Sequence, residues 1–144
     1  MRLEIVPLTD ALVKDWRAIH NRIIPTAPLS RAEVVERAGR NHLTLAYADG
    51  VLVGNATVRP PTADGVATVI VRVLPGYRRR GLGGAYLRAE LAVAHALGAR
   101  RIETVVLASN GDGLAFALAH GFVEHDRYVL PGDTVPFVDL HLPS

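Results

Sequence analysis

The sequence has 144 residues, which suits a single domain spanning 1–144, and its 49% hydrophobic and 21% charged residues are typical of a globular chain. It contains no cysteine, which excludes disulfide bonds, thiolate metal ligands and a cysteine nucleophile. The net charge of +2 is too small for a protein that coats nucleic acid, so no nucleic-acid partner is expected. No apolar run reaches the ~20 residues that span a bilayer, and the first residues lack a signal-peptide core. We therefore expect a cytoplasmic protein without a membrane partner.

The chain opens with the pattern of a strand followed by a helix. Residues 2–8 alternate apolar and polar side chains, as a half-buried strand does. Thr9 or Asp10 is a candidate N-cap for a helix, which ends before Pro25 and Pro28. At helical spacing, the apolar face of this helix consists of Leu12, Trp16, Ile19 and Ile23.

A second helix and a hairpin come next. Ser30 and Glu33 have the spacing of a capping box, which predicts a helix start at this point. Two runs with β propensity, 43–48 and 51–58, are joined by Asp49-Gly50. This dipeptide predicts a two-residue hairpin, because both of its turn positions require positive φ.

The remaining elements alternate between strands and helices. They are an apolar strand at 66–73, a helix at 81–97, a strand at 101–107, a short helix at about 113–120, and strands near 122–130 and 135–141. The strand–helix–strand unit requires a parallel pair, whereas the earlier hairpin is antiparallel. The sequence thus predicts an α/β three-layer domain with about four helices and a mixed sheet of six to seven strands.

A basic, glycine-rich turn follows the strand at 66–73. It reads Pro75-Gly76-Tyr77-Arg78-Arg79-Arg80-Gly81-Leu82-Gly83-Gly84 and opens a helix. A helix start offers unpaired N–H groups and the positive end of the helix dipole. Glycines allow phosphates to approach those N–H groups, and arginines add charge-assisted donors. The turn therefore predicts a diphosphate cradle, and the alternative is a basic turn whose glycines only cap the helix.

Neither of the commoner phosphate loops fits this turn. No GxxxxGK[ST] pattern is present. A dinucleotide GxGxxG pattern also fails, because Tyr86 stands where the last glycine belongs.

The turn resembles the acetyl-CoA loop of the GNAT superfamily of N-acetyltransferases, V-x-P-x-x-R-x-x-G-x-G/A. The matching residues are Val73, Pro75, Arg78, Gly81 and Gly83. A second family element, an Asn followed eleven residues later by Gly-Phe, matches Asn110 and Gly121-Phe122. The predicted order of elements also resembles the family's, so the similarity covers essentially the whole chain.

The resemblance implies acetyl-CoA as acyl donor and assigns roles to individual positions. Backbone groups of Val71 and Val73 would pair with the pantetheine arm as an added strand does, and the N–H of Val73 would also stabilise the oxyanion. The N–H groups of residues 79–84 would hold the pyrophosphate. The implied cofactor-binding set is Val71, Arg72, Val73, Arg78, Arg79, Arg80, Gly81, Leu82, Gly83, Gly84, Ala85, Asn110 and Phe116.

Two of these residues also have ordinary structural interpretations. Asn110 would contact the pantetheine or acetyl group, or it is a turn residue that caps the next helix. Phe116 packs near the cofactor arm or simply in the core.

The catalytic side chains are less clear. Many family members carry, seven residues after the Asn, a tyrosine that protonates the departing thiolate. This sequence has Ala117 at that position. A general acid contributes typically 10²–10⁴-fold, yet a thiol of pKa about 8.5 also leaves as an anion, so activity can survive at a lower rate. Candidate proton-transfer residues are Glu103, Tyr128 and His120, each of which also fits a structural or exposed role. No metal is expected.

The sequence therefore predicts an N-acetyltransferase that moves the acetyl group of acetyl-CoA directly to a primary amine of a small molecule or peptide. One alternative, motivated by Ala117, is an acyl-CoA-binding sensor or accessory domain with little or no turnover. Another is a structural module whose basic turn binds anions incidentally. Edge strands near 122–141 make a homodimer conceivable.

Overall fold

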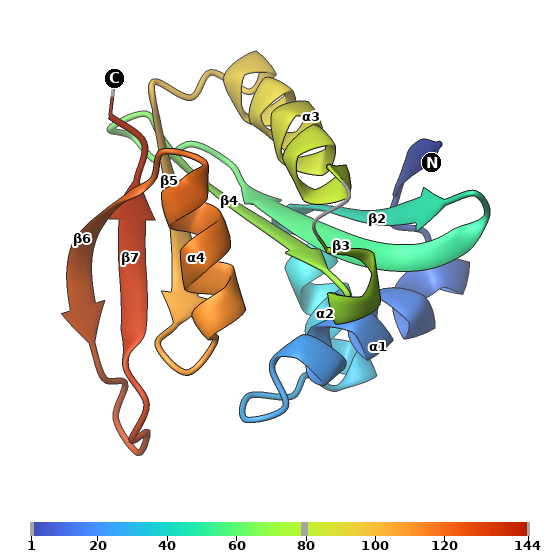
Figure 1. The fold of residues 1–144 in the computed structure, drawn as a ribbon, viewed down its shortest axis with the longest axis horizontal. Coiled ribbons are helices and arrows are strands. Elements are labelled where there is room, and N and C mark those ends of the chain that lie inside the picture. Colours follow the sequence, from blue (N-terminus) through green and yellow to red (C-terminus); the bar gives the residue numbers. More distant parts are fainter. Residues whose placement is uncertain (1, 79–80, 144) are drawn as a thin grey trace.

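The computed structural model describes residues 2–78 and 81–143, and these form one mixed sheet flanked by helices on both faces (Figure 1). The order of the strands across the sheet is β1-β2-β3-β4-β5-β7-β6. Only the β4–β5 pair is parallel, and the other neighbours are antiparallel. The strands are β1 (Leu3–Pro7), β2 (His42–Ala48), β3 (Val51–Arg59), β4 (Val66–Val73), β5 (Arg101–Leu107), β6 (Val123–Tyr128) and β7 (Phe137–His141).

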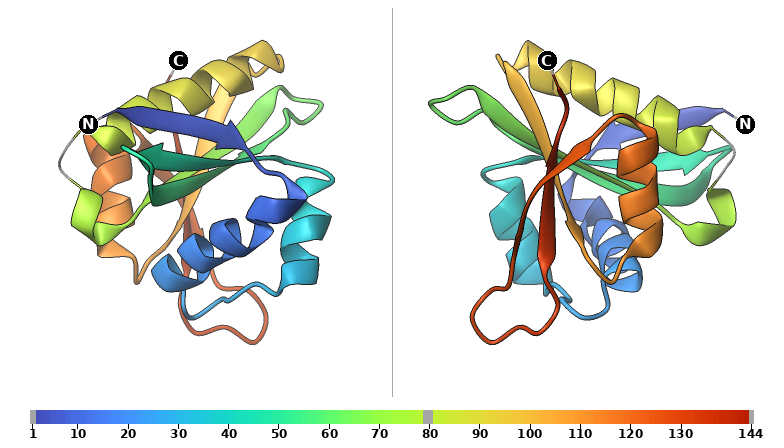
Figure 2. Two further views of the ribbon diagram at one scale, coloured as in Figure 1. Left: turned by 90° about the vertical axis from the view of Figure 1, so that its right-hand side faces the viewer. Right: turned by 60° about the vertical axis from the view of Figure 1, so that its left-hand side comes forward.

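Four α-helices cover the two faces of this sheet (Figure 2). The first pair packs together on one face, and the second pair covers the other, with α3 against β3 and β4 and α4 against β5. The helices are α1 (Val13–Ile23), α2 (Arg31–Ala38), α3 (Leu82–Ala96) and α4 (Gly111–Ala119), and short 3₁₀ turns span Asp10–Leu12 and Pro75–Tyr77. The predicted three-layer α/β fold with a mixed sheet is confirmed, with seven strands.

The layer formed by α1 and α2 shows how local sequence sets the element boundaries. The capping box at Ser30 is present, since its hydroxyl accepts from Glu33 N (3.2 Å) and its own N–H donates to the Glu33 carboxylate (2.9 Å). The predicted cap of the first helix is wrong, because neither Thr9 nor Asp10 caps it. A 3₁₀ turn intervenes and the N-cap is Leu12, which makes no side-chain capping bond.

The hairpin between β2 and β3 turns as its dipeptide predicts. Asp49 and Gly50 both have positive φ, at 49° and 83°. Next to this turn the pairing of β2 with β3 shifts register between Ala46 and Tyr47.

A buried polar network fixes α3 to the sheet. The Thr44 hydroxyl lies 2.7 Å from the Tyr86 hydroxyl and 2.5 Å from Glu90 Oε1. Burial raises the pKa of Glu90, so its carboxyl group resists ionisation in the fold. These bonds connect the middle of α3 to β2 and so hold the N-terminus of the helix near the end of β4.

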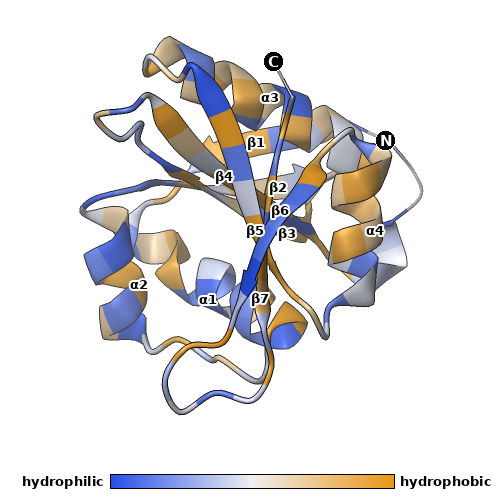
Figure 3. Ribbon diagram, turned by 90° about the vertical axis from the view of Figure 1, so that its left-hand side faces the viewer, coloured by the Kyte–Doolittle hydropathy of each residue, from blue (hydrophilic) through white to orange (hydrophobic). Residues whose placement is uncertain are grey.

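The C-terminal hairpin completes the sheet. β7 lies between β5 and β6, so β6 forms an edge strand, and it is exposed along its whole length and largely hydrophilic (Figure 3). None of the helices in the described residues combines the length and apolar character that crossing a bilayer requires.

Candidate active site

The β4 and β5 strands pair at one end and separate at the other. Their register runs through Val66–Arg101, Ala67–Ile102 and Thr68–Glu103 and then stops, although all residues of both strands are described. Figure 1 shows the two strands diverging from this point. The last residues of β4 therefore have a strand partner on the β3 side and an opening on the other.

The backbone of β4 directs polar groups into this opening. Val73 pairs with Gly54, and Leu74 N donates to Val53 O (2.8 Å), which identifies Val73–Gly54 as a non-hydrogen-bonded pair. The N–H and C=O of Val73 therefore point away from β3, and the same alternation applies to Val71. The pantetheine pairing that the family resemblance implies for both residues would need this orientation.

Two cavities meet where the strands separate. The α4-side cavity, of about 740 Å³, lies between the end of β4 and the starts of α3 and α4. The α1-side cavity, of about 370 Å³, lies toward α1, α2 and the end of β6. Five residues line both cavities, so the two spaces adjoin, and these residues are Val71, Arg72, Asn110, Gly113 and Phe116.

The N-terminus of α3 faces the α4-side cavity through its glycines. Gly81 has φ +77°, a left-handed conformation that glycine adopts without strain, and it begins the helix. Gly81, Gly83 and Gly84 line the cavity, whereas the Leu82 side chain is buried beneath the helix. Ala85, which the resemblance also includes in the cofactor-binding set, lines neither cavity, and its N–H donates to Gly81 O (3.1 Å) as the first bond of the helix.

Packing against α4 explains two of these glycines. A Cβ on Gly83 would lie 2.8 Å from the Phe116 ring, and one on Gly84 would lie 3.2 Å from His120. The expectation that their missing side chains make room for phosphate is therefore incomplete. They also let the start of α3 approach an aromatic pair, Phe116 and His120, whose ring centroids are 4.4 Å apart and whose planes are tilted by 51°.

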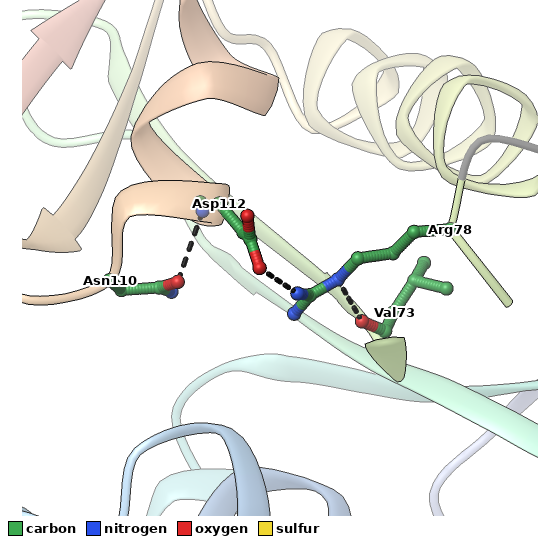
Figure 4. Close-up of polar contacts among 5 residues, drawn as sticks. Val73, Arg78, Asn110 and Asp112 are labelled. Carbon is green, nitrogen blue, oxygen red and sulfur yellow. Dashed lines mark hydrogen bonds and ion pairs between the residues drawn. The ribbon is translucent and has the colours of Figure 1, made fainter. Parts of the chain in front are cut away.

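Arg78 lines the α4-side cavity and bonds to residues on two sides of it (Figure 4). Its Nε donates to Val73 O (2.9 Å), and its Nη1 pairs with the Asp112 carboxylate (2.7 Å). The guanidinium thus connects the end of β4 to the first turn of α4. Arg79 and Arg80, which the sequence also assigned to cofactor binding, lie outside the described residues.

Asn110 has the structural role that the sequence left open. Its side-chain oxygen accepts from Gly113 N (3.0 Å), so it caps α4 (Figure 4). Because Asn110 also lines both cavities, capping places its amide beside the opening.

The candidate proton-transfer residues are dispersed. Glu103 lies at the paired end of β5 and lines neither cavity. His120 lines the α4-side cavity, and Tyr128 lines the α1-side cavity, where its hydroxyl donates to Asp139 (3.2 Å). Ala117 is buried beside the same cavity and offers no acid there.

Three arginines line the α1-side cavity: Arg37 from α2, Arg59 from β3 and Arg72 from β4. No carboxylate of the described chain lines it. Although Arg72 keeps some exposure overall, its Nη1 atom is buried and has no hydrogen-bond partner among the described residues. Burial, together with repulsion from Arg37 and Arg59, lowers the pKa of Arg72 to about 10, so the group remains charged at neutral pH.

His20 shares this basic environment. It is 4% exposed, stacks on Trp16, and its Nδ1 lies 3.1 Å from Asn21 Oδ1. Burial lowers the pKa of His20 to about 4, and the charge of Arg72 acts in the same direction. The imidazole is therefore neutral at physiological pH.

This depressed pKa predicts a loss of stability in acid. Because the pKa is about 4 in the fold and near 6.5 in the unfolded chain, the contribution of His20 is complete above pH 6.5. It is lost as pH falls toward 4, by on the order of 3 kcal/mol. The measurement is the unfolding free energy in urea of the wild type and His20→Gln between pH 7.5 and 4. Subtracting the unfolding free energies of the two proteins cancels the titration of all other groups, including Glu90, whose raised pKa acts in the opposite direction. If the two free energies change in parallel with pH, the assignment to His20 is wrong.

Sequence reasoning missed the basic lining of the α1-side cavity. Its charged residues come from three separate elements, and no short motif connects them. One signal was present, since Arg72 is the charged residue of a mostly apolar strand (VATVIVRV). Across the described residues, no three His, Asp or Glu side chains are grouped as metal ligands would be.

Comparison with known proteins identifies the family. The model of the Acetyltransferase (GNAT) family matches residues 6–122, most of the chain. The protein therefore belongs to the GNAT acetyltransferase family, as the sequence predicted.

Individual relatives match either a part of the chain or the whole chain at low sequence identity. Mycothiol acetyltransferase of Thermomonospora curvata is 47% identical over 64 residues, which are 44% of this chain and only 22% of that protein. A structure assigned as a phosphinothricin N-acetyltransferase superimposes with a TM-score of 0.81 at 19% identity, over 98% of each chain. The protein yncA of Salmonella typhimurium, solved with its cofactor acetyl-CoA, gives 0.76 at 15% identity over 97% of this chain and 92% of the other. At these identities the two structures support the fold alone.

Proposed function

We propose that the protein is an N-acetyltransferase that moves the acetyl group of acetyl-CoA directly to a primary amine. The observation that carries this proposal is the coincidence of two features at one 740 Å³ cavity. The first is the open edge of β4, where the N–H groups of Val71 and Val73 point into the opening. The second is the glycine-bounded start of α3, whose first N–H groups and dipole favour an anion.

The residues present suit acetyl-CoA. The open edge of β4 offers strand-like pairing to the amide groups of a pantetheine arm. The helix start accommodates a diphosphate through Leu82, Gly83 and Gly84, whose N–H groups precede the first bonded amide of the helix. Phe116 lines both cavities with an apolar ring that an acyl chain can contact.

Direct transfer of the acetyl group needs few catalytic side chains. Acetyl-CoA supplies a thioester whose carbonyl carbon the amine nitrogen attacks; the C–S bond breaks, CoA leaves with the electron pair, and the amine proton passes to solvent. The Val73 N–H stabilises the oxyanion that forms. The Arg78 bond to Val73 O steadies the strand end that carries this N–H.

Cofactor binding is the first test. Acetyl-CoA at a hundred times its dissociation constant should stabilise the fold by about 2.7 kcal/mol. For a chain of this length, this corresponds to a rise in Tm on the order of 5–10 °C. Acetyl-pantetheine, which lacks the diphosphate, is the matched control and should give a smaller rise. No shift with acetyl-CoA in a thermal melt would refute the proposal.

Turnover distinguishes the transferase from the sensor or accessory domain. We expect amine-dependent release of CoA thiol above the rate of thioester hydrolysis. Binding of acetyl-CoA without release across a broad amine panel would favour the sensor.

A further inference from the structure

We propose that the acceptor of this transferase carries an acidic group, a carboxylate or a phosphonate, beside its amine, and that the arginine cluster of Arg37, Arg59 and Arg72 binds that group in the α1-side cavity. The inference rests on the proposed function, since it concerns the second substrate of the same site. It goes further by naming the chemical class of that substrate.

The first support is the charge of the cavity. Three arginines line a volume of about 370 Å³, and no carboxylate of the described residues lines it. Burial, and after it repulsion from Arg37 and Arg59, lowers the pKa of Arg72. Like charges gathered in a partly buried space destabilise the fold unless an anion joins them. The cavity therefore favours an anionic ligand and disfavours a polycation.

The second support is that neighbouring carboxylates are already engaged. Glu33 accepts from the N–H of Ser30 in the capping box. Glu36 is paired with Arg40 at 2.8 Å, and Asp139 accepts from Tyr128 at 3.2 Å. None of these groups lines the cavity.

The third support is the unsatisfied donor at the junction. Nη1 of Arg72 is buried without a partner among the described residues, and Arg72 lines both cavities. A buried guanidinium N–H without an acceptor is costly, and the oxygens of a carboxylate or a phosphonate fit the fork geometry of the guanidinium. An acid held by Arg72 would bring the amine of the same molecule to the opening between β4 and β5.

The same cluster helps to prepare the amine. Positive charges close to an ammonium group disfavour its protonated form. An acceptor anchored by its acid therefore presents an amine that loses its proton more readily, in a cavity that no carboxylate of the described residues lines as a base.

The experiment compares matched acceptors that differ in the acidic group. Release of CoA thiol at saturating acetyl-CoA gives kcat/KM for β-alanine against β-alaninamide, and for 2-aminoethylphosphonate against ethanolamine. The first pair tests a carboxylate and the second a phosphonate. We expect the acidic member of at least one pair to be preferred roughly 10- to 100-fold, the range for a charged hydrogen bond. Equal or reversed preference in both pairs, or preference for putrescine, would overturn the inference and leave the transferase intact.

Substitutions in the arginine cluster test whether it causes the preference for acidic acceptors. Arg37→Gln should reduce the acidic preference about tenfold, while Arg40→Gln, just beyond the same helix but paired outside the cavity, should not change it. Arg59→Gln serves as a second probe if Arg37→Gln melts early. The rise in Tm with acetyl-CoA should persist in all three variants, and its absence from the wild type would refute the proposed function instead.

If no acceptor turns over, the same pairs of acceptors are compared by the rise in Tm that they cause in the presence of CoA. Equal rises would then overturn the inference.

Discussion

Replacing Val73 with proline should lower kcat by about 10²–10³-fold while leaving the protein folded. The substitution removes the N–H that we assign to the oxyanion. Because Val73–Gly54 is a non-hydrogen-bonded pair, it breaks no bond between β3 and β4. The Val73 carbonyl remains, so the hydrogen bond from Arg78 is kept. Steady-state release of CoA thiol and a thermal melt measure the two effects separately.

Val71→Pro is the matched control, since it removes the next N–H along the same open edge. We expect it to raise the dissociation constant of acetyl-CoA by roughly 2- to 10-fold, the value of one ordinary hydrogen bond, with kcat at saturation changed little. A folded Val73→Pro enzyme with kcat within about threefold of the wild type would remove Val73 from the mechanism.

Gly54→Ala should lower Tm by roughly 10 °C, which corresponds to about 3 kcal/mol for a chain of this length. Gly54 lies opposite Val73, and a methyl group on it would overlap the backbone carbonyl oxygen of Arg72. A backbone oxygen cannot rotate aside as a side chain can, so β3 and β4 must separate. The substitution therefore disturbs the strand that carries both the oxyanion donor and Arg72.

Gly76→Ala isolates the steric effect of that methyl group. A methyl group on Gly76 would meet no other atom within 4 Å, and the φ of Gly76 is not positive. The same chemical change should therefore alter Tm by at most about a degree or two. Equal Tm values for Gly54→Ala and the wild type would show that the sheet absorbs the methyl group.

Local chemistry made much of the fold predictable. The Asp49-Gly50 turn and the Ser30 capping box act within a few residues, and the structure contains both. Thr9 failed as a cap because a 3₁₀ turn moved the helix start beyond its reach. The helix predicted at 81–97 ends one residue earlier, at Ala96, and Leu97, just past its end, is 49% exposed.

The site was predictable only where it follows a continuous motif. The strand end and the glycine turn are adjacent in sequence, so the α4-side cavity could be anticipated. The α1-side cavity could not, because Arg37, Arg59 and Arg72 meet only after α2 packs beneath the sheet. Helix packing also accounts for Gly83, whose neighbour Phe116 is far away in sequence.

In the transferase that we propose, we expect the bridge from Arg78 to Asp112 to affect how CoA leaves the site. Since this guanidinium already neutralises a carboxylate, an incoming diphosphate that recruits Arg78 exchanges one counter-ion for another. We therefore expect the affinity for CoA to depend weakly on ionic strength for a ligand of such high charge. We expect Asp112, which would then face the phosphates, to compete for Arg78 and to speed the release of CoA.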